Sequence, residues 1–195
     1  MGASDDRVRV YKVGGSLFDW PELFERLEAL LRNEPGRPLI VAGGGSAADV
    51  VRNWDRVHSL GETRAHRLAI ASLRLSEAFL AGGLSRAKIV SDRRSAEAVW
   101  NAEGVPVLCA EAFLEAEETS GQAPLPASWE VTSDSIAAWI AGRWPADLVL
   151  LKSTTPLLSQ GLFVDSFFPQ ATPAVRSVEW MNLRTGDRGP LEGFS

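Results

Sequence analysis

The chain has 195 residues, of which 45% are hydrophobic and 23% charged, with a formal net charge of −5 at pH 7. This composition is that of an ordinary globular protein long enough to bury a core, and it predicts one domain over residues 1–195. The basic residues are scattered, which argues against nucleic acid and anionic membranes as partners. No apolar run approaches membrane-spanning length and the N-terminus lacks a signal-peptide pattern, so we expect a cytoplasmic protein.

The first strand-like run, Val8 to Val13, carries a lysine and ends in a glycine turn. It contains Lys12 and continues into Gly14, Gly15 and Ser16, after which leucines at helical spacing predict a helix. Such a turn lets backbone N–H groups approach an anion, and the helix N-terminus and the lysine add positive charge. The pattern therefore predicts a phosphate site. It is not a Walker A loop, and an ordinary strand-to-helix turn is the alternative.

A second buried strand, Leu39 to Ala42, runs into Gly43, Gly44 and Gly45. Three successive glycines are costly in backbone entropy, so they indicate a place where the backbone comes very close to something else. Because the carboxyl ends of parallel strands meet at one edge of a sheet, where open α/β sheets bind ligands, we expect both glycine turns at one site. The spacing also fits a dinucleotide fingerprint loosely, but it follows the second strand and not the first.

Strand and helix signals alternate along the rest of the chain. Strands are predicted at Ala87–Val90, Val105–Cys109, Asp147–Leu151 and Val178–Leu183, and helices at Glu62–Leu80, Ser95–Glu103, Ala110–Glu118 and Thr132–Ala141. This alternation predicts an α/β fold with a mostly parallel sheet covered by helices on both faces. The C-terminal end, with Gly186, Gly189, Pro190 and Gly193, is expected to be loosely ordered.

Few residues in the chain suit a metal or a disulfide. Cys109 is the single cysteine and is expected to be a buried, inert thiol, while only two histidines occur. We therefore expect no transition-metal site made by the protein. Seven tryptophans are many for this length, and we expect most to pack in the core and some to cover the interface of a homo-oligomer.

Three motifs, taken in order, resemble those of the amino acid kinase superfamily: Lys12 to Ser16, Gly43 to Gly45, and Thr132 to Asp134. Three further stretches are similar to the small kinases of methanofuran biosynthesis within that superfamily: Ala65–Ile70, Ser128–Ser135 and Gly161–Asp165. The resemblance implies a three-layer αβα sandwich of the carbamate kinase type. It also implies transfer of a phosphoryl group from ATP, with Mg²⁺ carried on the nucleotide phosphates, to a small-molecule phosphate of the aminomethylfuran type.

The resemblance further implies a role for each matching residue. Lys12 is expected to hold the transferred phosphoryl group, with Lys152 as a second lysine and Asp134 orienting both. The residues expected to contact the nucleotide phosphates are Gly14, Gly15, Ser16 and Ser153. The residues expected to contact the acceptor are Gly43, Gly44, Gly45, His66 and Asp165.

Alternatives stay open for several of these residues and for the function. His66 also fits a packed interface histidine, Thr132 to Asp134 a helix N-cap, and Asp165 a turn cap. The turn after the late strand, Lys152 to Pro156, lacks the carboxylate and glycine that many superfamily members carry there. The alternative functions are a kinase for a carboxylate or a nucleoside monophosphate, or a non-catalytic relative that binds anions or assembles with a partner.

Overall fold

The structure is a computed structural model that describes residues 6–121, 125–156 and 163–194. The strands are β1 (Val8–Val13), β2 (Arg37–Ala42), β3 (Ala87–Val90), β4 (Val105–Leu108), β5 (Asp147–Lys152), β6 (Ser177–Asn182) and β7 (Arg188–Pro190). The helices are α1 (Leu23–Asn33), α2 (Gly45–His58), α3 (Glu62–Gly83), α4 (Arg93–Asn101), α5 (Ala110–Thr119), α6 (Ser133–Arg143) and α7 (Phe168–Ala171), with a 3-10 turn η1 (Gly15–Leu17) after β1.

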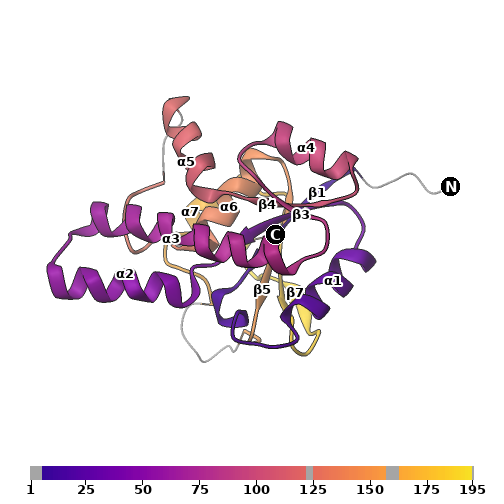
Figure 1. The fold of residues 1–195 in the computed structure, drawn as a ribbon, viewed down its shortest axis with the longest axis horizontal. Helices are drawn as coiled ribbons and strands as arrows, with labels where there is room; N and C mark the ends of the chain where they lie inside the picture. The colour runs from indigo at the N-terminus through magenta and orange to yellow at the C-terminus, as the bar shows by residue number, and fades with distance from the viewer. Residues whose placement is uncertain (1–5, 122–124, 157–162, 195) are drawn as a thin grey trace.

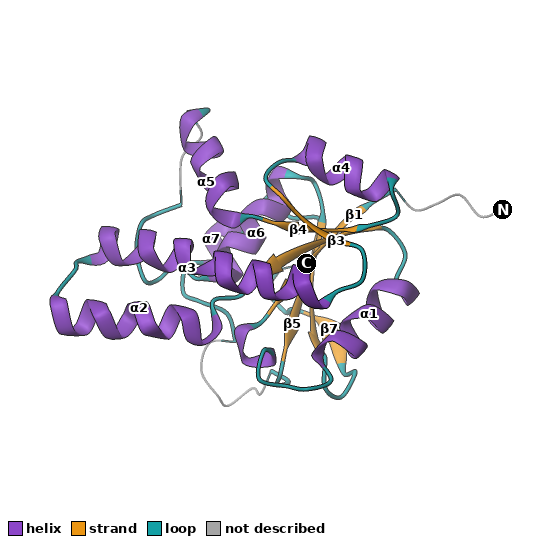
Figure 2. Cartoon of the chain, in the orientation of Figure 1, coloured by secondary structure: helices purple, strands orange, loops and turns teal. Residues whose placement is uncertain are grey.

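The strands form one seven-stranded sheet in the order β3-β4-β2-β1-β5-β6-β7. The pairs are parallel except the last, because β7 runs antiparallel to β6. In Figure 2 the strands lie in the middle of the molecule with helices around them. The predicted α/β fold with a mostly parallel sheet is confirmed, and every strand that was expected is present.

Side chains on the two faces of the sheet belong to two separate cores. Val10 and Leu150 point into a core closed by α5, α6 and α7. Tyr11 and Val149 point the opposite way, into a core closed by α1 and the end of α3. Successive strand residues are therefore buried on alternate faces, which is why these strands read as continuous apolar runs. The arrangement is the predicted three-layer αβα sandwich.

Helices α2 and α3 form a hairpin that projects beyond the sheet (Figure 1). The link between them is a short turn in which Ser59 and Gly61 have positive φ angles of 50° and 79°. Only Ala48 and Val51 of α2 are buried, so this helix covers the molecule at its margin. Among the described residues, no helix is both long and apolar enough to cross a membrane.

The C-terminal end is ordered, and the prediction that it would be loose is wrong. Gly186, with φ of 85°, lies in a turn where its N–H donates to Asn182 O at 2.8 Å, and β7 returns along β6. The N–H of Leu191 then donates to Val178 O at 2.9 Å, and the Phe194 ring packs edge-on against Phe168. Gly186 thus marks a hairpin turn, which needs positive φ, and not disorder.

Candidate functional site

The two glycine turns contact each other at the carboxyl edge of the sheet, as the sequence predicted. A Cβ atom on Gly15 would lie 2.2 Å from the backbone nitrogen of Gly45, and one on Gly43 would lie 2.7 Å from the nitrogen of Gly15. Gly45 also has a φ of 52°, which side chains rarely adopt. Each turn therefore requires glycine in order to pack against the other.

Gly14 and Gly43 use their backbone N–H groups within the sheet. The Gly14 N–H donates to Leu151 O, and the Gly43 N–H donates to Val13 O, each at 2.8 Å. These bonds continue the strand pairing of β1 with β5 and with β2 beyond the ends of the strands. For both residues the structure shows a role in packing, while Gly15, Gly44 and Gly45 reach the neighbouring cavity.

Lys12, Asp134 and Lys152 meet beside these turns. Lys12 Nζ lies 2.8 Å from Asp134 Oδ1, and Lys152 Nζ lies 2.7 Å from Asp134 Oδ2. Lys12 of β1 is opposite Leu150 of β5, so Lys152, two residues further on, emerges on the same face of the sheet. Asp134 comes from the first turn of α6. Lysine is rare in this chain, since Lys88 is the one other, yet two lysines share one carboxylate.

The electrostatics of this cluster leave one positive charge in a buried place. Asp134 is 5% exposed, and burial alone would raise its pKa, but the charges and hydrogen bonds of Lys12 and Lys152 hold the pKa below its usual range. The pKa of Lys152 is lowered by burial and by the charge of Lys12, against the opposing effect of Asp134. Two ammonium groups and one carboxylate carry a net charge of about +1, which the nearby Asp165 carboxylate offsets in part at Lys152 and which an anion can balance further.

Thr132 to Asp134 serve as a helix N-cap and also contribute a carboxylate to the lysine cluster, the two roles that the sequence allowed. Thr132 is the N-cap of α6, with its hydroxyl accepting from the Asp134 N–H at 3.4 Å, while the Asp134 side chain turns to the lysines. Asp165 supports the same helix start. Its carboxylate accepts from the N–H of Thr132 and of Ser135, both at 3.1 Å, and from both hydroxyls. Asp165 therefore caps α6, and it bonds to Thr132, which lines the neighbouring cavity.

A cavity of about 410 Å³ opens from the glycine turns between α2, α3 and the start of α6. Of the predicted site residues, Gly15, Ser16, Gly44, Gly45 and His66 line it. His66 is buried there, and burial lowers its pKa despite a backbone hydrogen bond to Ser128 and the nearby charge of Glu62. Its imidazole is therefore neutral at pH 7.

Sequence reasoning missed several polar or aromatic residues of this cavity, among them Asp19, Asp49, Arg52 and Trp129. Trp129 lies in a stretch that resembles known kinases, but the tryptophan itself carried no signal of a pocket. Asp49 and Arg52 occupy ordinary exposed positions of an amphipathic helix pattern, so only the fold shows which way they face.

The hydroxyl groups of Ser16 and Ser153 contact each other next to the end of β5. Their hydroxyl oxygens are 2.8 Å apart, which joins the turn after β1 to the turn after β5. Asn182, buried at the end of β6, donates to the Thr155 hydroxyl at 3.3 Å and so holds the second turn from the other side. The neighbouring Gly161 and Leu162, from a stretch that resembled known kinases, lie outside the described residues.

Comparisons with known proteins agree with this geometry. The sequence profile of the Amino acid kinase family matches residues 7–159. The chain is similar to the [5-(aminomethyl)furan-3-yl]methyl phosphate kinase of Methanocaldococcus jannaschii, with 27% identity over 137 residues, which are 68% of this chain and 59% of that protein. The chain therefore matches less than two thirds of this relative's length. The uridylate kinase of Archaeoglobus fulgidus shares the fold, with a TM-score of 0.55 and 20% identity over 82% of this chain and 69% of that one.

Proposed function

Because the chain belongs to the amino acid kinase family, we propose that it transfers a phosphoryl group from ATP to a small-molecule phosphate. The observation that carries this proposal is the meeting of Lys12, Asp134 and Lys152 beside two glycine turns. Charge spreads over the moving group in the transition state of phosphoryl transfer, so positioning and positive charge contribute most of the catalysis. The two lysines, held by Asp134 beside the glycine turns, supply both.

Each member of the cluster has a distinct task in this reaction. Lys12 and Lys152 are donors to the oxygens of the transferred group, and Asp134 holds both ammonium groups at a fixed spacing. The carboxylate cannot stabilise negative charge itself, but without it the two cations would repel each other. A phosphate acceptor is already ionised at neutral pH, so the site requires no general base.

The nucleotide would lie on the β5 side of the cluster, and the acceptor in the cavity on the α2–α3 side. ATP supplies the phosphoryl group and carries Mg²⁺ on its phosphates. Among residues 6–121, 125–156 and 163–194, no group of three or more His, Cys, Asp and Glu side chains is placed to hold a metal. Asp134 in particular is already occupied by the lysines. Ser16 and Ser153, whose hydroxyls join the turns after β1 and β5, would contact the nucleotide phosphates. Gly15 and Ser16 also line the acceptor cavity, so the two sites would meet there.

The acceptor that the likeness favours is an aminomethylfuran-type phosphate. Its phosphate would lie at Gly44 and Gly45, which border the cavity, and its body would extend toward His66. Burial lowers the pKa of His66, and a neutral imidazole has one nitrogen that can accept a hydrogen bond from an acceptor molecule.

A second candidate function is anion binding without transfer. The turn from Ser153 to Pro156 has neither the carboxylate nor the glycine that many members of the superfamily use to shape the nucleotide pocket. Under this alternative the lysines bind a phosphate group of a ligand, but ATP does not bind. The two functions therefore differ in their response to Mg-ATP.

The deciding experiment incubates the protein with Mg-ATP and a panel of acceptors, and follows ADP and product by phosphorus NMR. The panel holds the aminomethylfuran methyl phosphate, uridine monophosphate and a carboxylate acceptor. We expect a new diphosphate signal with the first. Lys152→Ala should abolish it, whereas Lys88→Ala, an exposed lysine on β3, should not. If no ADP forms with any acceptor and titration with Mg-ATP releases no heat, the kinase proposal is wrong and the anion-binding function takes its place.

A further inference from the structure

One wall of the cavity is an aromatic ring that α2 holds in place. The ring of Trp129 lines the cavity, and its Nε1–H donates to Asp55 Oδ2 at 2.9 Å. The guanidinium carbon of Arg52 lies 5.3 Å from the ring centroid, over its face. Arg52 is in turn fixed by Asp49, with Nη1 2.6 Å from Oδ1. One edge and one face of the ring are therefore held by charged side chains.

Asp55 ties this ring to the α2–α3 turn as well. Its other oxygen, Oδ1, accepts from the Gly61 N–H at 3.2 Å, just before α3 begins. One carboxylate thus fixes both the end of the hairpin and the edge of the tryptophan ring. Asp55 at the edge and Arg52 over the face together set the orientation of the indole ring.

The segment that carries the ring also leads into the lysine cluster. Three residues after Trp129 comes Thr132, the N-cap of α6, and Asp134 follows in the first turn. Ile70 and the neutral His66 line the same cavity, and His66 interacts with the backbone of Ser128, next to Trp129. A ligand whose phosphate lies at the glycine turns and whose body fills this cavity would therefore contact the ring of Trp129.

We propose that Trp129 makes this cavity selective for an acceptor with a flat, unsaturated ring, and that Asp55 is the positioning residue that holds the tryptophan. The proposal rests on the proposed function for the statement that the cavity takes a phosphate-bearing acceptor. A flat ring packs against indole with its π-system as well as its surface, whereas a puckered ring of the same size offers only surface. Selectivity for a flat ring can therefore be measured as the ratio of the affinities for a flat and a puckered ring of the same size.

The test compares benzyl phosphate with cyclohexylmethyl phosphate, two probes with the same charged group and similar size. Their dissociation constants are measured by titration calorimetry on the full chain. We expect wild-type protein to bind benzyl phosphate about 2- to 10-fold more tightly, because aromatic pairs are worth roughly 0.5–1.5 kcal/mol beyond the area they bury. Equal affinities would overturn the proposal, and so would binding of neither probe.

Variants separate the ring from its support. Trp129→Leu should bring the ratio of affinities close to one while both probes still bind through their phosphate, and Trp129→Phe should keep the preference. Asp55→Ala should reduce the ratio, and Asp55→Asn, which keeps an oxygen for the indole N–H, should restore it. A ratio that persists in Trp129→Leu would show that other residues make the selection.

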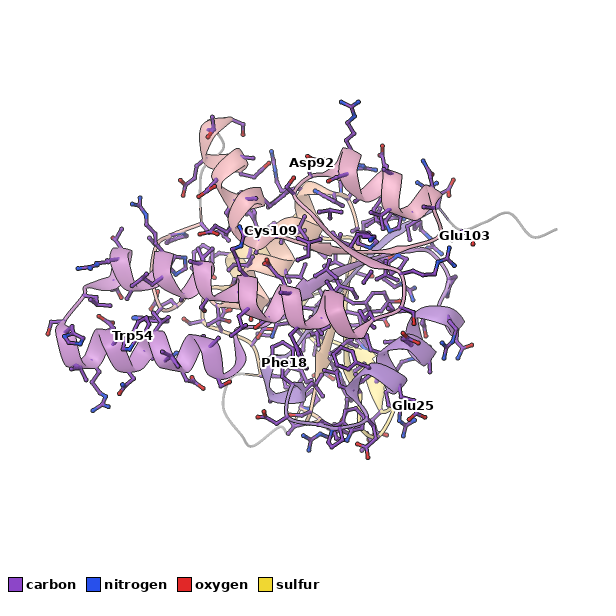
Figure 3. The ribbon with its side chains drawn as sticks, in the orientation of Figure 1. Phe18, Glu25, Trp54, Asp92, Glu103 and Cys109 are labelled. Carbon is purple, nitrogen blue, oxygen red and sulfur yellow. The ribbon has the colours of Figure 1, made fainter. Side chains whose placement is uncertain are left out.

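Trp54 provides the matched control on the same helix. It is 48% exposed, lies on α2 (Figure 3) and does not line the cavity, so Trp54→Leu should leave the ratio unchanged. A change as large as that of Trp129→Leu would mean that the ratio reports general loosening of the helix, which counts against the proposal. The assay needs no ATP, so a wild-type preference without phosphoryl transfer would contradict the proposed function and leave this inference standing.

Discussion

Two buried carboxylates, Asp134 and Glu77, differ in what surrounds them. Asp134 lies at the carboxyl edge of the sheet between two lysines, and it is 5% exposed. Glu77 lies on α3 and is 1% exposed, and its Oε1 accepts the Ala110 N–H at 2.9 Å at the start of α5. Burial favours the neutral acid in both places. The pKa of Asp134 is nevertheless lowered by its lysines, whereas burial raises the pKa of Glu77.

The difference shows that burial of an acid does not by itself mark a functional site. The hydrogen bond from Ala110 lowers the pKa of Glu77, but by less than burial raises it. Glu77 therefore accepts a bond at the start of a helix, and its charged form is destabilised by burial. Asp134, in contrast, is shared by two lysines beside the glycine turns, and these three groups have one surplus positive charge. Surplus positive charge, and not burial of an acid, therefore marks the site. Substitutions at the two acids test this difference.

The largest expected effect is that of Asp134→Asn on stability. Removing one member of a buried ion pair leaves an uncompensated charge and typically costs about 3–5 kcal/mol of unfolding free energy. Here two ammonium groups would remain without their common counter-ion. We expect a large drop in melting temperature, measured by calorimetry, and a partial recovery in sulfate, because an anion that binds the folded protein stabilises it by mass action.

The cap of α6 serves as the internal control for this variant. Thr132 and Asp165 hold the helix start independently of the Asp134 side chain. If Asp134 acted only through the helix dipole, its loss would cost about 1 kcal/mol or less, and sulfate would stabilise variant and wild type equally. Such a result would place Asp134 in the same class as Glu77.

The next effect concerns catalysis by Lys12. If the proposed transfer occurs, Lys12→Ala removes a donor to the moving group, and loss of one such donor typically lowers kcat by about 10²- to 10³-fold. The corresponding change at the other acid, Glu77→Ala, should leave kcat within about twofold, since Glu77 contacts no residue of the cavity wall by hydrogen bond. Turnover by coupled ADP release measures both. A Lys12→Ala enzyme with near-normal kcat would remove this lysine from the mechanism.

A smaller effect is the pH dependence of anion binding. Because the folded pKa of Lys152 lies below the ordinary 10.5, the side chain loses its proton at a lower pH than a solvated lysine does. Sulfate keeps a constant charge over this range. The rise in melting temperature that sulfate produces should therefore be full at neutral pH and should fall as the pH rises through the folded pKa of Lys152, before 10.5 is reached. Protection that remains unchanged up to that pH would mean that Lys152 does not hold the anion.

The residues that the sequence predicted together are those fixed by the ends of parallel strands. Lys12, Lys152 and the glycine turns follow β1, β5 and β2, which are neighbours in the sheet, so any parallel arrangement brings them to one edge. Asp134 was predictable only from the family likeness, since its local pattern is equally that of a helix cap. The order of the motifs along the chain therefore predicted the lysine cluster better than any single motif did.

The residues that the sequence did not predict depend on side-chain direction and on long-range pairing. The sequence did not specify that Asp165 meets the start of α6, where its carboxylate accepts four hydrogen bonds from Thr132 and Ser135. Trp129 joins the cavity because Asp55, far away in sequence, holds its edge. The strand β7 is only three residues long and forms because β6 offers an open edge. Local composition carries none of this information.

The smallest expected effect, Glu77→Gln, separates the two acids most cleanly. The raised pKa means that the folded protein holds the proton of Glu77 more tightly than the unfolded chain does, so stability falls as pH rises from the ordinary 4.5 through the folded pKa. Glutamine keeps an oxygen for the Ala110 N–H and removes the charge that Cys109, Arg74 and Glu111 surround. We expect Glu77→Gln to be as stable as wild type or more stable, by up to about 1 kcal/mol at pH 8, and to lose part of the pH dependence. Glu77→Ala should instead be destabilised by about 1–3 kcal/mol, because the Ala110 N–H loses its partner. If denaturant unfolding at pH 8 showed equal losses for both variants, the charge of Glu77 would be needed, and the contrast with Asp134 would fail.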